Sequence, residues 1–149
     1  MKTPRVLIAD DDRSVRTALR KRLMASGYQV FESQDGLGVV DQALREKPDA
    51  IVLDYEMPNG DGCSIAWFIR KECDAPIVFL SGYGRETFRQ AVMTLSNVFY
   101  LPKPFDAPRL LELLASLVRP APARSDGPRA DAVPEAAMER TSAQDSDSR

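Results

Sequence analysis

Five short apolar segments alternate with five segments of helical period, and this pattern constrains the fold more strongly than any other feature. Runs of this length suit buried parallel strands, and apolar residues three and four positions apart are typical of amphipathic helices. The alternation predicts an α/β fold, a five-stranded parallel sheet with helices on both faces. The expected strands are 5–9, 28–32, 50–53, 76–80 and 98–101, and the expected helices are 14–25, 35–44, one around 65–69, 85–95 and 107–118.

Charged or polar residues follow four of these expected strands. They are Asp10, Asp11 and Asp12 after the first strand, Asp54 after the third, Ser81 after the fourth and Lys103 after the fifth. Ligands of open α/β sheets bind outside the carboxyl ends of the strands, so we expect these side chains to meet at one edge. Several carboxylates facing one ammonium would form a site for a hard cation beside a phosphate-sized pocket.

Aspartate at a strand end also has a plain structural explanation, because it caps turns and helices. We interpret Asp12 as the cap of the first helix and Asp35 as the cap of the second. Asp54 precedes no obvious helix, so a binding site explains it better. Lys103 stands between two prolines, which restrict the backbone and therefore the direction of its side chain.

The composition excludes several other kinds of site. Histidine is absent, so the chain offers no conventional zinc site, no histidine general base and no phosphohistidine of its own. Cys63 and Cys73 lie ten residues apart in what we expect to be one helix. That spacing separates their Cα atoms by about 15 Å and excludes a disulfide. Acidic and basic residues balance up to Arg119, so the chain lacks a basic nucleic-acid footprint.

The ends of the chain give expectations about location and organisation. No apolar stretch approaches the roughly 18 residues of a membrane span, and residues 1–4 carry no signal-peptide core, so we expect a cytoplasmic protein. From Pro120 onward the chain is rich in Pro, Ala, Ser and Asp and poor in large apolar residues. We expect residues 1–119 to form one domain and 120–149 a disordered tail, or alternatively a partner-binding segment.

Five motifs together resemble the receiver domain of two-component response regulators, over residues 5 to about 119. In the order of that family they are Val6-Leu7-Ile8-Ala9-Asp10-Asp11-Asp12, Ile51-Val52-Leu53-Asp54-Tyr55-Glu56-Met57-Pro58, Asp61-Gly62, Phe79-Leu80-Ser81-Gly82-Tyr83-Gly84 and Tyr100-Leu101-Pro102-Lys103-Pro104-Phe105. The resemblance implies a flavodoxin-like, doubly wound sheet of strand order 2-1-3-4-5 with five helices. It also implies a cis peptide bond between Lys103 and Pro104.

The resemblance assigns roles to the acidic residues at the expected edge of the sheet. Asp54 would be the phosphoacceptor, a carboxylate that becomes an aspartyl phosphate. Asp11 and Asp54 would bind Mg²⁺ directly, together with the backbone carbonyl of Glu56. Asp10 would act on the cation through water.

The resemblance also implies a switch. Lys103 would pair with one phosphoryl oxygen, and the Ser81 hydroxyl would donate to another. Ser81 and Tyr100 would move on phosphorylation, the hydroxyl toward the phosphate and the ring inward, with ordinary packing as the alternative for Tyr100. Two residues depart from the usual family pattern: Ser81 stands where threonine is more frequent, and Glu56 adds a carboxylate whose effect has no predicted sign.

By this resemblance the chain is a stand-alone, CheY-like signalling module. It would accept a phosphoryl group from a histidine kinase or histidine phosphotransfer protein and switch its contacts with a downstream protein. The resemblance allows a homodimer through the fourth helix, fifth strand and fifth helix. From the composition and the short, polar segment after Arg119 we expect no direct nucleic-acid binding and no membrane binding. Basic residues around the first helix are a solvated face or a kinase-docking surface. Two other functions stay open: a Mg²⁺-dependent phosphohydrolase acting through an aspartyl phosphate, and a binding module indifferent to phosphorylation.

Overall fold

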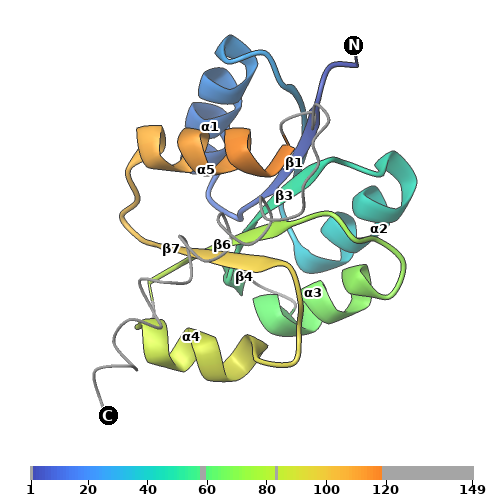
Figure 1. Cartoon of the computed structure of the whole chain (residues 1–149), viewed down its shortest axis with the longest axis vertical. Coiled ribbons are helices and arrows are strands. Elements are labelled where there is room, and N and C mark those ends of the chain that lie inside the picture. Colours follow the sequence, from blue (N-terminus) through green and yellow to red (C-terminus); the bar gives the residue numbers. More distant parts are fainter. Residues whose placement is uncertain (1, 58–59, 83, 119–149) are drawn as a thin grey trace.

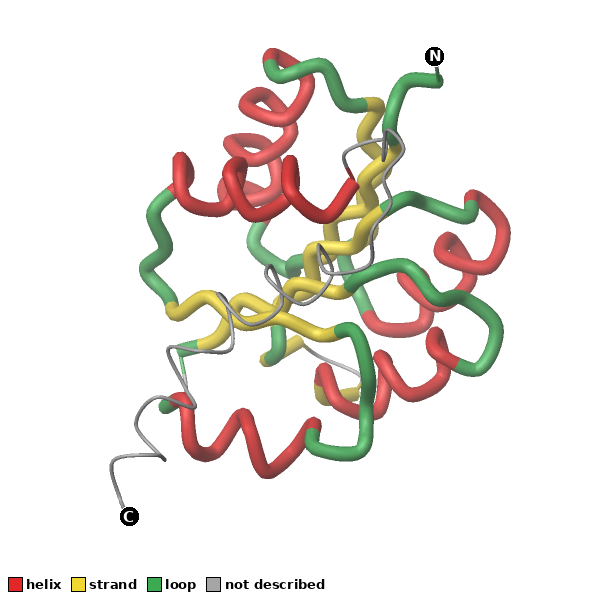
Figure 2. Tube along the Cα trace, in the orientation of Figure 1, coloured by secondary structure: helices red, strands yellow, loops and turns green. Residues whose placement is uncertain are grey.

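The computed structural model describes residues 2–57, 60–82 and 84–118. In these residues the chain forms a five-stranded sheet, a two-stranded ribbon and five helices (Figure 1, Figure 2). The strands are β1 (Arg5–Ala9), β2 (Gln29–Ser33), β3 (Ala50–Asp54), β4 (Glu56–Met57), β5 (Gly60–Asp61), β6 (Ile77–Ser81) and β7 (Val98–Pro102). The helices are α1 (Arg13–Ala25), α2 (Gly36–Glu46), α3 (Gly62–Arg70), α4 (Arg85–Val92) and α5 (Ala107–Val118).

The main sheet has the strand order β2-β1-β3-β6-β7, and every neighbouring pair is parallel. Without the ribbon strands this order is 2-1-3-4-5, so the predicted flavodoxin-like topology is confirmed. The chain runs outward from β1 to β2 and then crosses back to β3 on the other side of β1. The point where the strand order reverses therefore lies between β1 and β3, and its carboxyl edge is where such folds place ligands.

Helices cover both faces of the sheet. Helices α1 and α5 lie on one face, and α2, α3 and α4 lie on the other (Figure 1). Successive strand residues point to opposite faces, so each central strand serves both layers. In β1, Leu7 packs with the layer of α2, α3 and α4, whereas Ile8 packs with that of α1 and α5. All five residues of β3 are buried, which fixes the strand that delivers Asp54.

Strand boundaries differ slightly from the prediction. Strands β2 and β6 each begin and end one residue later than expected. Parallel pairing explains the shift, because Ser33 pairs with Ala9 and Ser81 pairs with Pro102. The ribbon of β4 and β5 was not predicted, since its strands have only two residues each, and the residues between them, 58–59, lie outside the described part of the chain.

The predicted end of the fourth helix is wrong. We expected residues 85–95, but α4 ends at Val92. The Leu95 N–H donates to the Val92 carbonyl at 2.9 Å, and Asn97 takes a left-handed φ of 58°. Leu95 thus packs against the core from a turn, which an apolar period cannot distinguish from a last helical turn.

The placement of both cysteines in one helix is also wrong, because α3 ends at Arg70 and Cys73 lies beyond it. The Arg70 guanidinium donates to the carbonyls of Cys73 and Ala75, at 2.7 and 2.8 Å, and so holds the chain in a turn. Neither Cys63 nor Cys73 is in a disulfide bond. In the part of the chain that the structure describes, no helix is long and apolar enough to cross a membrane. The predicted tail, residues 120–149, lies outside the described residues.

Candidate functional site

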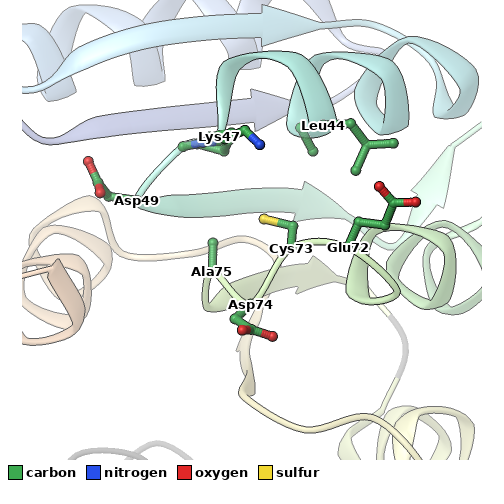
Figure 3. A pocket seen from close by; sticks show the side chains of 9 residues that line it. Leu44, Lys47, Asp49, Glu72, Cys73, Asp74 and Ala75 are labelled. Atoms are coloured by element: carbon green, nitrogen blue, oxygen red, sulfur yellow. The ribbon is translucent and has the colours of Figure 1, made fainter.

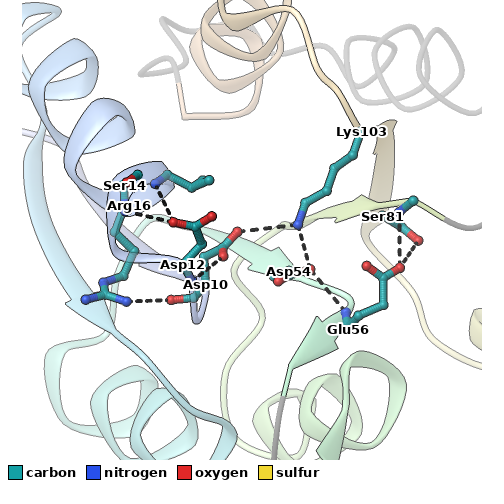
Figure 4. A network of polar contacts seen from close by, with 10 residues as sticks. Asp10, Asp12, Ser14, Arg16, Asp54, Glu56, Ser81 and Lys103 are labelled. Atoms are coloured by element: carbon teal, nitrogen blue, oxygen red, sulfur yellow. Dashed lines mark hydrogen bonds and ion pairs between the residues drawn. The ribbon is translucent and has the colours of Figure 1, made fainter.

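The polar residues at the strand ends come together as predicted. One carboxylate oxygen from each of Asp10, Asp11 and Asp54 lies within 4.8 Å of the others. The ammonium of Lys103 reaches between two of them, with its Nζ 3.1 Å from Asp54 Oδ1 and 3.6 Å from Asp10 Oδ2 (Figure 4). The edge of the sheet thus carries three carboxylates facing one ammonium.

Strand register explains this convergence. Ala9 of β1 pairs with Leu53 of β3, so Asp10, just after β1, and Asp54, the last residue of β3, lie at the same level of the carboxyl edge. On the other side, the Lys103 N–H donates to the Ser81 carbonyl at 2.8 Å and extends the pairing of β6 with β7. The Lys103–Pro104 bond is cis, as expected.

Asp10 is buried and held in one orientation. Its Oδ1 accepts the Asp12 N–H at 2.9 Å, and its main-chain carbonyl accepts Arg16 Nη1 at 2.8 Å. Its Oδ2 is buried without a hydrogen-bond partner. Burial raises the pKa of Asp10, against the opposing effects of the Asp12 N–H and the Lys103 charge. A buried carboxylate oxygen left in this state suits a cation.

Asp54 is 2% exposed and lies at the centre of the site. Its Oδ1 accepts the Glu56 N–H and the Lys103 ammonium, both at 3.1 Å. An ion pair alone would lower the pKa of a carboxyl group. Burial outweighs it here and, with the Asp10 charge, raises the pKa of Asp54 to about 6. Asp54 thus holds a proton more tightly than an ordinary aspartate does, even with the Lys103 ammonium beside it.

The same balance acts on Lys103 with the opposite result. Partial burial lowers the pKa of Lys103, but the Asp54, Asp10 and Glu56 carboxylates together outweigh that effect and raise it. Lys103 therefore stays a fixed positive charge at neutral pH.

Glu56 has a contact that the sequence did not predict. Its Oε2 accepts the Ser81 hydroxyl at 2.9 Å and the Gly82 N–H at 3.1 Å (Figure 4). The role of the Gly82 N–H was missed as well. Strand alternation offered a signal: Tyr55 and Met57 are apolar, so the residue between them should face the other way, toward the site.

Two further predicted residues have clear positions. Asp12 caps α1, as expected, with its carboxylate accepting the N–H groups of Ser14 and Val15. Tyr100 of β7 is buried, and its ring centroid lies 4.8 Å from the ring centroid of Phe88 on α4.

A hollow of about 410 Å³ lies at the opposite, amino edge of the sheet (Figure 3). The ends of α2 and α3 line it, with Lys47, Glu72 and Cys73 among the lining residues. None of the predicted site residues lines it, so it is separate from the acidic site.

Residues 6–115 match the response regulator receiver domain family. Response regulator MprA of Mycobacterium sp. (strain KMS) is 39% identical over 116 residues, which cover 77% of this chain and 50% of MprA. MprA of Mycobacterium avium (strain 104) is 38% identical over the same length. The chain thus spans about half the length of the curated relatives it matches.

Solved structures agree in fold. The receiver domain of the Francisella response regulator 1452 superposes with a TM-score of 0.73 at 27% identity, covering 80% of this chain and 99% of that domain. The response regulator domain of Thermotoga maritima CheB has a TM-score of 0.71 at 27% identity, covering 81% and 100%. The chain therefore belongs to the response regulator receiver domain family, and it is a phosphoaccepting signalling module rather than a conventional enzyme.

Proposed function

We propose that Asp54 is the phosphoacceptor. The observation that carries this proposal is its central position, with the Lys103 ammonium 3.1 Å away and with one oxygen of each of the Asp10, Asp11 and Asp54 carboxylates within 4.8 Å of the others. A carboxylate placed there can attack phosphorus while neighbouring groups neutralise the charge of the phosphoryl oxygens.

The donor we propose is a phosphohistidine of a histidine kinase or a histidine phosphotransfer protein, the partner that a receiver domain implies; residues 1–149 contain no histidine. An Asp54 oxygen forms a bond to phosphorus, and the bond between phosphorus and the imidazole nitrogen breaks. The nitrogen keeps the electron pair of that bond and takes up one proton from solvent, which leaves a neutral imidazole on the donor. The products are an aspartyl phosphate here and a free histidine on the donor.

The acidic triad of Asp10, Asp11 and Asp54 is typical of the magnesium site of receiver domains. The residues fit such an ion: three carboxylate oxygens converge, and the buried Oδ2 of Asp10 makes no hydrogen bond, although the Lys103 ammonium lies 3.6 Å from it. Asp11, Asp54 and the Glu56 backbone carbonyl would hold Mg²⁺ directly, and Asp10 would hold it through water. A bound Mg²⁺ supplies the positive charge that offsets both the carboxylates and the phosphoryl oxygens.

Lys103 and Ser81 are proposed to hold the phosphoryl group once it is transferred. Lys103 pairs with one oxygen as a point charge. The Ser81 hydroxyl donates to another, for which it must leave its present acceptor. Tyr100 moves with Ser81, because Ser81 lies on β6 and Tyr100 lies on the neighbouring strand β7. The contact between the Tyr100 and Phe88 rings links Tyr100 to α4.

The output is a change in protein contacts. We propose that the face formed by α4, β7 and α5 alters its affinity for a downstream protein or for a second copy of the chain, in the cytoplasm. Couplings of this kind are typically worth about 1–3 kcal/mol. The stand-alone character of the module stays a prediction.

Incubation with acetyl phosphate and Mg²⁺ tests the phosphoacceptor assignment. The intact mass should rise by one phosphoryl group in the wild-type protein and in an Asp12→Asn control, which keeps a helix cap. It should not rise in Asp54→Asn or without Mg²⁺. Undiminished labelling of Asp54→Asn would reject the proposal.

A further inference from the structure

The Glu56 carboxylate accepts hydrogen bonds from two donors at the end of β6, the Ser81 hydroxyl and the Gly82 N–H. A single oxygen, Oε2, accepts the Ser81 hydroxyl at 2.9 Å and the Gly82 N–H at 3.1 Å (Figure 4). Both bonds are charge-assisted, a class about twice as strong as neutral hydrogen bonds. Ser81 is fully buried, Glu56 is partly exposed and Gly82 is exposed, so the bond from the Ser81 hydroxyl is better shielded from solvent than the bond from the Gly82 N–H.

The backbone around Glu56 fixes the direction of this side chain. Its neighbours Tyr55 and Met57 are 8% and 7% exposed, and the residue between two inward-facing neighbours points the other way. The Tyr55 N–H donates to the Leu80 carbonyl at 2.9 Å, which ties this segment to β6. Pairing with Asp61 across the ribbon holds Glu56 from the other side. The contact with Ser81 thus follows from main-chain structure.

The Ser81 hydroxyl has one proton and can donate it to one acceptor at a time. The proposed function requires that proton for a phosphoryl oxygen on Asp54, and Glu56 already holds it. The Glu56 carboxylate is also an anion beside the place that an anionic group must enter, so the two compete by charge as well as for the donor.

We propose that Glu56 is a positioning residue for the phosphorylation switch: its carboxylate latches Ser81 and Gly82 in the unphosphorylated protein and must release them when Asp54 carries a phosphoryl group. This inference rests on the proposed function of Asp54. The latch stabilises the unphosphorylated conformation, so removing it makes the phosphorylated conformation easier to reach.

Binding of beryllofluoride, which stands in for the phosphoryl group on a carboxylate, tests the latch in the presence of Mg²⁺. Glu56→Ala should bind it about tenfold more tightly than wild type, the effect of losing a charge-assisted bond. Glu56→Gln should be intermediate, because its amide oxygen still accepts both donors without the charge. The matched control is Glu72→Gln at the opposite edge of the sheet (Figure 3), and it should equal wild type. Equal affinities for the Gln and Ala variants would point to charge alone and overturn the latch.

A double-mutant cycle with Ser81→Ala separates the latch from general repulsion. The gain from Glu56→Ala should shrink severalfold in the Ser81→Ala background, since one of the two latched donors is already gone. An equal gain in both backgrounds would overturn the inference. Thermal melts of each variant with Mg²⁺ establish that the variant is folded. If Glu56→Ala does not fold, Glu56→Gln provides the comparison, because glutamine has nearly the same shape as glutamate.

Amide hydrogen exchange measures, without any ligand, whether Glu56 protects the Gly82 N–H. The Gly82 amide should exchange faster in Glu56→Ala than in wild type or Glu72→Gln, and unchanged exchange would contradict the inference. Failure of the two proposals is distinguishable. Wild-type protein that neither binds beryllofluoride nor takes up phosphate would overturn the proposed function and this inference with it. Normal binding by wild type, unaltered in the Glu56 variants, would overturn this inference alone.

Discussion

Lys103 Nζ lies 3.1 Å from Asp54 Oδ1, although 49 residues of sequence separate them. Burial still raises the pKa of Asp54 to about 6, so this ammonium compensates only part of the cost of a buried negative charge. A cation bound at the acidic triad, as we propose, would offset further negative charge at this edge of the sheet.

Replacing Lys103 with methionine should slow phosphorylation. Methionine is an unbranched side chain only one heavy atom shorter than lysine, and it lacks the charge that would stabilise the phosphoryl oxygens during transfer. We expect the rate of labelling by acetyl phosphate to fall by about 100-fold. Lys71→Met is the control, because Lys71 lies over the Trp67 ring on the exposed side of α3. A rate within twofold of wild type for Lys103→Met would contradict the proposed role.

The raised pKa of Asp54 predicts a pH dependence in the metal-free protein. Its folded pKa of about 6 lies above the ordinary 3.8, so the folded state holds this proton more tightly than the unfolded state does. The resulting stability is present below about pH 4 and is lost as pH rises through 6. Wild type should therefore lose up to about 3 kcal/mol relative to Asp54→Asn over that window. Urea unfolding at several pH values measures the difference, and parallel stability curves would refute it.

Magnesium binding should reverse the effect of removing an acidic residue. Asp11→Asn relieves repulsion among the three carboxylates, so without Mg²⁺ its free energy of unfolding should exceed that of wild type by about 0.5–1 kcal/mol. With Mg²⁺ the order should invert, because wild type keeps a ligand that the variant has lost. Thermal melts across a Mg²⁺ titration test this. An increase in melting temperature with Mg²⁺ that is equal in both proteins would remove Asp11 from the site.

Replacing Asp12 should lower the stability of the fold without affecting Mg²⁺ binding. Its carboxylate accepts the N–H groups of Ser14 and Val15 at 2.8 and 3.4 Å. Asp12→Ala should lower the free energy of unfolding by about 1 kcal/mol, the usual value for a lost helix cap. Asp12→Ser should restore most of that stability. Mg²⁺ affinity should stay unchanged in both variants, and a large loss of affinity would show that Asp12 belongs to the metal site.

Much of the site could be predicted because its geometry follows from topology. Asp10, Asp54 and Lys103 each follow a buried parallel strand, and the carboxyl ends of such strands meet at one edge. The Asp12 cap was predictable for a local reason, since it depends on residues two and three positions along the chain.

The contacts that were missed depend on tertiary register. The bond between Glu56 and Ser81 needs β4 held beside β6, and a two-residue ribbon strand leaves no period in the sequence to read. The end of α4 was misplaced because Leu95 is apolar in either a helix or a turn. Cys73 was misplaced because the turn after Arg70 is fixed by hydrogen bonds to backbone carbonyls, which sequence patterns do not encode.

The most direct test of the central claim is to locate the phosphoryl group. Protein labelled with acetyl phosphate and Mg²⁺ is reduced with borohydride, which converts an aspartyl phosphate to homoserine, and the peptides are sequenced by mass spectrometry. Our account predicts homoserine at position 54, and none when Mg²⁺ is omitted. Homoserine at another aspartate, with residue 54 intact, would contradict it.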